Sequence, residues 1–145
     1  MRYNANMGRE IGDLVEMSTQ QHDDIDDRLM EYLGEQTADW PEGKVHLGVL
    51  VDGKLVAGVI GDMSEFWIMH IATLWVDEEY RRRGIAQRLM SELEKRAREQ
   101  GAKVIRLDAF DAPSAAFYHS IGYQEIGQYT VKDGSYTEHL FVKHL

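Results

Sequence analysis

Residues 66–86 read FWIMHIATLWVDEEYRRRGIA and set the architecture, because they join a strongly apolar run to an amphipathic helix through a basic turn. The apolar run, Phe66–Val76, is rich in aromatic and β-branched residues and contains neither Gly nor Pro. That composition predicts a central strand covered on both faces. Asp77–Glu79 form the turn after it. A helix then follows, with an apolar face made of Ile85, Leu89, Met90, Leu93 and Ala97 and a stop at Gln100-Gly101.

The turn Arg81–Ala86 is the only dense cationic cluster in a chain of net charge −9, and it leads into the predicted helix. The first turn of a helix leaves four backbone N–H groups without intrahelical acceptors and carries roughly half a positive charge, so it binds phosphate readily. Gly84 has no Cβ and Ala86 is small, which would let a ligand approach closely. A solvated basic turn is the alternative interpretation. Neither a Gly-x-Gly-x-x-Gly nor a Walker sequence is present.

Two motifs resemble the GNAT superfamily of N-acetyltransferases. Arg81-x-x-Gly84-x-Ala86, placed after a strand ending Leu74-Trp75-Val76, resembles the acetyl-CoA signature of that family, Gln/Arg-x-x-Gly-x-Gly/Ala. The segment DAPSAAFYHSIGY at residues 111–123 resembles the closing element of the family, a short helix with a tyrosine followed by an aliphatic residue, Gly and an aromatic. The two motifs stand in the family's order and at its usual separation, and the resemblance covers residues 12–145.

The resemblance implies an α+β fold with a mixed, mostly antiparallel sheet of about six to seven strands flanked by three to four helices. It also implies acetyl-CoA as cosubstrate, no metal, and a sheet splayed open between the strand before the basic turn and the strand after the following helix. Pantetheine would lie in that opening like an added strand. The residues implied to bind acetyl-CoA are Leu74, Trp75, Val76, Arg81, Arg82, Arg83, Gly84, Ile85, Ala86, Gln87 and Asp111, with the backbone N–H groups of residues 82–87 gripping the pyrophosphate.

The resemblance implies that Tyr118 is the general acid. A phenol with a pKa of about 10 stays protonated at neutral pH and can give its proton to a departing thiolate. From the sequence alone, Tyr118 would equally be a core aromatic beside Phe117 and Tyr123. Asp111 stands where relatives often carry an asparagine, which weakens its expected contact with the cofactor, and Pro113 could start the short helix instead.

The general base is predicted to be His70, which has a pKa near neutrality and lies in the long strand. Alternation places His70 on the same face as Ala72 and Leu74 unless a bulge shifts the parity. Glu65, Glu125 and water are the alternative bases, and each carboxylate could simply be a solvated surface group. Many relatives carry an acidic residue near position 72, where this chain has alanine. A core histidine remains the other interpretation of His70.

The leading function is acetylation of a primary amine of a small molecule by direct attack on the thioester. Acetylation of a protein or peptide amine and non-catalytic binding of acetyl-CoA are the alternatives, although the presence of Tyr118 disfavours a non-catalytic module. Tyr32, Trp40 and Trp67 could line an amine pocket through cation–π contacts, or could pack in the core. The acidic run Asp23–Asp27 could attract a cation, although it also suits the start of a helix.

Composition favours one enzyme domain over residues 12–145, after a loosely ordered tail over residues 1–11. The chain has 145 residues and no cysteine, which excludes disulfides and a catalytic thiol, and its six histidines show no metal-binding spacing. A sequence pI of about 5.1 disfavours nucleic acid as a partner. No apolar run reaches about 18 residues and no signal peptide is visible, which predicts a cytoplasmic protein without a membrane anchor. A homodimer is possible by analogy with the family.

The remaining elements are predicted from periodicity and turn residues. A first strand is expected over Gly12–Met17, followed by a helix capped by Ser18 or Thr19. The buried stripe of that helix would be Ile25, Leu29 and Leu33. Further along the chain we expect a hairpin of residues 45–51 and 55–60 around Asp52-Gly53, a strand at 104–109 that pairs in parallel with the long strand, a helix near 114–120, and a hairpin of residues 123–130 and 136–142.

Overall fold

The computed structural model describes residues 9–36 and 41–145, and its contacts divide the chain into two compact units, Met1–Ala38 and Asp39–Leu145. Each unit is described by itself. None of the described helices is both long and apolar enough to span a membrane. The elements are α1 (Thr19–Gln36), β1 (Lys44–Val51), β2 (Lys54–Ser64), a 3-10 turn η1 (Glu65–Trp67), β3 (Ile68–Val76), a second 3-10 turn η2 (Glu78–Tyr80), α2 (Ile85–Glu99), β4 (Val104–Ala109), α3 (Ala112–Ser120), β5 (Gln124–Val131) and β6 (Tyr136–His144).

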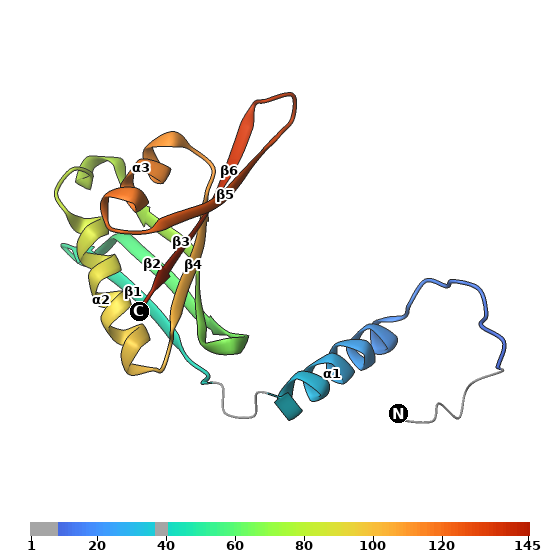
Figure 1. The fold of residues 1–145 in the computed structure, drawn as a ribbon. Coiled ribbons are helices and arrows are strands. Elements are labelled where there is room, and N and C mark those ends of the chain that lie inside the picture. The colour runs from blue at the N-terminus through green and yellow to red at the C-terminus, as the bar shows by residue number, and fades with distance from the viewer. Residues whose placement is uncertain (1–8, 37–40) are drawn as a thin grey trace. The chain divides into compact units, whose positions relative to one another are not determined.

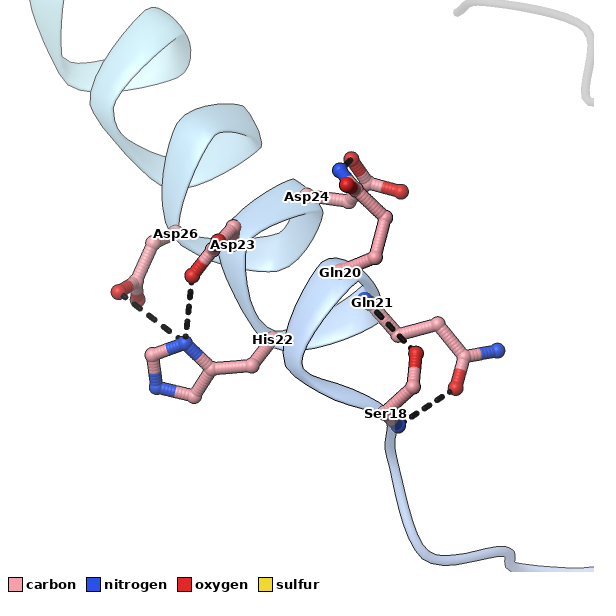
Figure 2. Close-up of polar contacts among 7 residues, drawn as sticks. All are labelled: Ser18, Gln20, Gln21, His22, Asp23, Asp24 and Asp26. Carbon is pink, nitrogen blue, oxygen red and sulfur yellow. Dashed lines mark hydrogen bonds and ion pairs between the residues drawn. The ribbon is translucent and has the colours of Figure 1, made fainter.

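The helix of the first unit begins with a capping box (Figure 2). Ser18 Oγ accepts a hydrogen bond from the Gln21 backbone N–H at 3.2 Å, and Gln21 Oε1 accepts one from the Ser18 N–H at 3.0 Å. The two bonds satisfy donors that the first turn would otherwise leave free. The side chain of His22 points back to Asp23, with Nδ1 and Oδ1 3.2 Å apart. The predicted cap at Ser18 is therefore confirmed.

One other prediction for this unit is wrong. Gly12–Met17 forms no strand, because a strand needs a partner for its backbone groups and the described part of this unit offers only a helix. Within this unit the apolar stripe of α1 is uncovered, since Ile25 is 50% exposed and Leu29 is 53% exposed. One helix cannot cover its own apolar face, so the burial expected for this stripe stays a prediction.

The second unit contains a six-stranded sheet in the order β1-β2-β3-β4-β6-β5 (Figure 1). Among the described strands, β3 and β4 are paired in parallel and the other neighbours are antiparallel. The β1–β2 hairpin turns at Asp52 (φ 49°) and Gly53 (φ 77°), as the Asp-Gly sequence predicted. The predicted parallel pairing and the predicted C-terminal hairpin are also confirmed, and together they give the expected mixed α+β fold.

Helices α2 and α3 pack against the same face of the sheet, which we call the helix face. Leu93 and Ala97 of α2 are fully buried in one cluster with Ile105 of β4 and Phe141 of β6. Tyr118 of α3 also packs against Phe141, with ring centroids 5.7 Å apart. The opposite side, which we call the outer face, carries the alternate residues of the same strands, among them His46, Asp62, His70, Arg106, Asp108 and Glu138.

The long strand begins later than predicted. Phe66 and Trp67 have positive φ angles of 64° and 62° and belong to the turn η1, so β3 starts at Ile68. The Trp67 carbonyl accepts a hydrogen bond from the Lys103 N–H at 2.8 Å, which ties this turn to the start of β4. Positive φ is rare for aromatic residues, and composition alone favoured a strand here.

A buried polar cluster joins α2 to the far end of the sheet. Lys143 Nζ of β6 donates to both carboxylate oxygens of Glu94 of α2, at 3.0 and 3.1 Å, and to the Ile121 carbonyl at 3.0 Å. The Tyr123 hydroxyl donates to the same carboxylate at 3.1 Å. Burial, followed by the charge of Glu94, raises the pKa of Tyr123, so this phenol stays protonated. The cluster holds the end of α3 and the start of β5 against α2.

We expect Lys143→Met to lower the free energy of unfolding by about 3 kcal/mol, because it leaves a buried carboxylate without its cation. The double variant Glu94→Gln/Lys143→Met should recover much of that loss. Urea unfolding followed by circular dichroism measures both. Arg96→Ala serves as control, because it breaks a solvent-exposed ion pair with Glu92 within α2. It should leave the unfolding midpoint nearly unchanged. Equal losses in the single and double variants would contradict this account of the cluster.

Candidate active site

The central feature of the site is that β3 and β4 separate soon after they meet. Only Ile68, Met69 and His70 of β3 pair with β4, opposite Val104, Ile105 and Arg106. Beyond these pairs β3 continues to Val76 with β2 on one side and no described strand on the other. The backbone groups on that edge have no ladder partner, so an extended ligand could bind there as a strand does.

A β-bulge lies within the separated part of β3. Ile71 pairs with Gly61 and Thr73 with Ile60, so Ala72 is the extra residue between them. The bulge reverses the alternation: Met69 and Ile71 face the helices before it, and Leu74 does so after it. His70 therefore lies on the outer face, on the side opposite Leu74, because the bulge that was named as the exception to simple alternation is present.

The basic turn leads into α2 as expected. Gly84 is the N-cap, with φ 76° in the left-handed region, and no side chain caps this helix. A Cβ at Gly84 would meet no atom within 4 Å, so the space in front of the first turn is open. The N–H groups of residues 85–87 precede the first intrahelical bond, which runs from the Arg88 N–H to the Gly84 carbonyl at 3.0 Å. An anion fits such a turn.

Two of the three arginines of the turn, Arg81 and Arg83, have partners within the protein. Arg81 Nε donates to the Val76 carbonyl at 2.9 Å, and its guanidinium lies 4.8 Å from the centre of the Trp75 ring. Trp75 Nε1 donates in turn to Asp77 at 2.9 Å. The guanidinium of Arg83 lies over Tyr80 at 5.4 Å. Arg81 therefore fixes the path of the turn, and its charge still contributes to the positive potential there.

A cavity of about 890 Å³ runs from this turn to α3. It brings together eleven of the thirteen residues that the sequence predicted for the site, while Arg83 and His70 do not line it. The roles of all thirteen stay predictions. The predicted residues that line the cavity are Leu74, Trp75, Val76, Arg81, Arg82, Gly84, Ile85, Ala86, Gln87, Asp111 and Tyr118, and Tyr80, Pro113, Ser114, Phe117, Ser120 and Ile121 line it too.

Helix α3 closes the cavity and is fixed at its start by Asp111. Asp111 Oδ1 accepts from the Ser114 N–H at 2.8 Å, and Oδ2 accepts from the Ser114 hydroxyl at 3.0 Å. With Pro113 in the first turn, this is an ordinary N-cap. The carboxylate of Asp111 thus already caps α3, and the expected contact with the cofactor would have to use the same two oxygen atoms.

Tyr118 lines the cavity and is only 7% exposed. Its ring packs edge-to-face against Phe117 and Tyr123, with centroids 5.3 and 5.8 Å away. Burial first, and then the negative charges of Asp108 and Asp111, raises the pKa of Tyr118 to about 12. The phenol is therefore a proton donor throughout the neutral range.

Of the two carboxylates proposed as alternative bases, Glu65 and Glu125, only Glu125 has a side chain that the structure describes. Glu125 of β5 contacts His139 and, at 3.6 Å, His119; it is half-buried and does not line the cavity. It is therefore a hydrogen-bond partner of His139 and not the solvated surface group that the sequence suggested. The side chain of Glu65 and all of Trp40 lie outside the described residues. Trp67 lies in η1 and Tyr32 is exposed on α1.

Sequence reasoning missed a carboxyl pair beside the gap between β3 and β4. Asp108 of β4 and Glu138 of β6 share a hydrogen bond on the outer face. The hydrogen bond, burial and the charge of Asp108 raise the pKa of Glu138. The two residues are thirty positions apart, and only the register of β4 against β6, in which Asp108 pairs with Leu140, brings them together. No local sequence signal could have found them.

The residues present fit acetyl-CoA. The uncapped first turn of α2 and the open space at Gly84 suit a pyrophosphate, and the unpaired edge of β3 suits the amides of pantetheine. Because the Val76 carbonyl already accepts from Arg81, Leu74 is the freer backbone partner. Among the described residues, no three His, Asp or Glu side chains converge as metal ligands would.

Comparison with known proteins agrees with this geometry. The sequence profile of the acetyltransferase (GNAT) family matches residues 12–123. A blasticidin-S acetyltransferase from Streptomyces morookaense is 33% identical over 94 residues, which are 64% of this chain and 68% of that protein. The crystal structure of an acetyltransferase from Bacillus cereus superposes with a TM-score of 0.81 at 32% identity, covering 92% of this chain and 98% of the other.

A Bacillus anthracis protein solved in complex with acetyl coenzyme A shares the fold, with a TM-score of 0.63 at 18% identity over 77% of this chain and 67% of its own. The divergent strands, the uncapped helix and the closing tyrosine are thus the features expected of one family. The chain belongs to the GNAT acetyltransferase family and is an acetyl-CoA-dependent N-acetyltransferase.

Proposed function

We propose that the chain acetylates a primary amine of a small molecule, by direct attack of the amine on the thioester of acetyl-CoA, with Tyr118 as general acid. The observation that carries this proposal is the cavity that joins the Gly84 turn to Tyr118 along the unpaired edge of β3. It would bring the thioester next to a buried phenol. The 33% identical relative is named for acetylation of blasticidin S, a small molecule, which supports this class of acceptor.

Different groups of the protein would carry out the separate steps of the reaction. Bound acetyl-CoA supplies the activated acetyl group. The main chain near Leu74 would donate to the carbonyl oxygen as negative charge develops there. Tyr118 would give its proton to the leaving sulfur. Burial raises the pKa of the phenol to about 12, and it would also raise the pKa of a thiol in the same place. The pKa values of the proton donor and of the thiol would therefore rise together. His70, the base expected from the sequence, lies on the outer face beside the gap and would accept the proton of the amine there.

The direct test is release of CoA thiol from acetyl-CoA in the presence of single amines. Blasticidin S, a polyamine, an amino sugar and a peptide with a free N-terminus form a suitable panel. Turnover with a small amine supports the proposal. Turnover with the peptide alone would assign the chain to protein acetylation, and binding of acetyl-CoA without turnover of any amine would make it a binding module.

Gly84→Glu should raise the Kd for CoA at least tenfold, as measured by isothermal titration calorimetry. The new carboxylate would occupy the anion site and repel the pyrophosphate. Gly53→Glu is the matched control, since Gly53 has nearly the same φ (77° against 76°) and also has open space around it. Both variants should lose about 1 kcal/mol of stability. Equal CoA affinity in the two variants would refute the anion site.

Tyr118→Phe should lower kcat about a hundredfold with little change in the KM for acetyl-CoA, because the phenol acts only when the thiolate forms. In the wild type, a pKa of about 12 means that Tyr118 does not itself cause a fall in rate between pH 7 and 10. Initial rates across that range test both statements. An unchanged kcat in Tyr118→Phe would remove the general acid from the mechanism.

A further inference from the structure

The carboxylate of Glu125 stands between two histidines that come from different elements. One of its oxygens, Oε1, bonds to Nδ1 of His139 on β6, and the other, Oε2, lies 3.6 Å from Nε2 of His119 on α3. Because an ionised carboxylate only accepts hydrogen bonds, Nδ1 of His139 carries the proton of this bond. The exposed fraction of the side chain is 26% for Glu125 and 20% for His139, so solvent weakens their contact only in part. Glu125 therefore links the helix α3 to the strand β6.

A β-bulge turns Glu125 toward the helices. Glu125 pairs with Phe141 and Gly127 pairs with Leu140, so Ile126 is the extra residue between them. Phe141 is buried on the helix face, and Glu125 opposite it therefore faces α3. In a regular strand Glu125 would share the face of Gly127, which is the outer face. Bulges of this kind are common next to active sites, where they re-aim a side chain.

The contacts of Glu125 continue to Tyr118 through two rings. The ring of His119 packs edge-to-face against Phe141, with centroids 5.1 Å apart. Phe141 also packs against the ring of Tyr118, at 5.7 Å. Tyr118 and His119 are consecutive residues of α3, so a movement of one backbone position moves the other as well. Glu125 is thus connected to Tyr118 both along the helix and through Phe141.

The other polar contacts of α3 hold its backbone at the two ends. Asp111 caps the first turn, and after the last turn Lys143 Nζ donates to the Ile121 carbonyl at 3.0 Å. Of the nine residues of α3, only His119 has a side chain that can carry a positive charge. Glu125 therefore holds a side chain of α3 directly beside Tyr118, which the contacts at the two ends do not.

We infer that Glu125 is a positioning residue for Tyr118: it holds His119 and, through α3, sets where the phenol lies in the cavity. This inference rests on the proposed function, in which Tyr118 protonates the leaving sulfur. A proton donor must lie within hydrogen-bond distance of the atom that it protonates, and a misplacement of about 1 Å can lower a rate about a hundredfold. Glu125 does not line the cavity, so its effect belongs in kcat and not in the binding of CoA.

A double-mutant cycle tests this role with whichever small amine of the panel is turned over. Glu125→Ala should lower kcat about tenfold and leave the Kd for CoA unchanged. In a Tyr118→Phe background the same change should lower kcat no further, because the phenol that Glu125 positions is absent. Glu125→Gln keeps an acceptor oxygen for His139 and should recover most of the rate. Equal losses in the two backgrounds, or a wild-type kcat in Glu125→Ala, would overturn the inference and leave the proposed function standing.

Hydrogen exchange tests the same contact without any amine, so it decides the inference even where Tyr118→Phe leaves kcat unchanged and refutes the proposed function. Glu125→Ala should raise the exchange rate of the backbone amides of residues 115–123 about threefold, because it releases one side of α3, and should leave that of α2 unchanged. Mass spectrometry of the exchanged peptides measures both. His119→Ala removes a half-exposed side chain from the other end of the contact and should give the same result.

Thr137→Val is the matched control for these variants. It removes a cross-strand hydrogen bond of 3.0 Å to Thr130 in the same hairpin, and it touches none of the residues between Glu125 and Tyr118. It should change neither kcat nor the exchange of α3. Wild-type exchange of α3 in both Glu125→Ala and His119→Ala, or the same increase in Thr137→Val, would contradict the positioning role.

Discussion

The structure depends on a break in hydrogen bonding: β3 and β4 pair over three residues and then part. A parallel pair normally continues along both strands, since each unpaired backbone group away from water is costly. Here β2 holds the other edge of β3 as far as Ala57 and Val76, so the strand stays extended while one edge is free. The buried cluster of Glu94, Lys143 and Tyr123 ties β6 and the start of β5 to α2, which itself packs on the first half of the sheet. An opening that is fixed on both sides in this way is preorganised for an extended ligand.

The anion-binding turn acts together with that opening. α2 packs against β1, β2 and β3, so its first turn is fixed at the end of the strand that forms one side of the gap. Gly84 leaves that turn without a side-chain cap, and the local sequence therefore leaves donors free that most helices satisfy internally. The arginines of the turn do more than add positive charge to the anion site. Arg81 is bonded to Val76 and stacked on Trp75, so much of its task is to hold the backbone of the turn.

Features set by neighbouring residues in the sequence were predictable, and features set by long-range register were not. The Asp52-Gly53 hairpin, the α2 stripe and the strand at 104–109 follow from turn chemistry and periodicity, and they formed where expected. The bulge at Ala72 has no local signal, because it arises from how β3 meets β2, and it moved His70 to the other face from Leu74. The Asp108–Glu138 pair depends on the register of β4 and β6. Periodicity also shows that Ile25 and Leu29 lie on the apolar face of α1, but it does not show what covers that face.

The two faces of the sheet present different side chains to the gap. Tyr118 and the residues expected to bind acetyl-CoA line the cavity on the helix face, whereas His70, Asp108 and Glu138 lie on the outer face. Under the proposed mechanism, an amine that entered through the cavity would share it with pantetheine, and the carboxylate in that lining, Asp111, already caps α3. An amine that came from the outer face would leave the sulfur on the side of the phenol, so that proton removal and proton donation would not compete for one group.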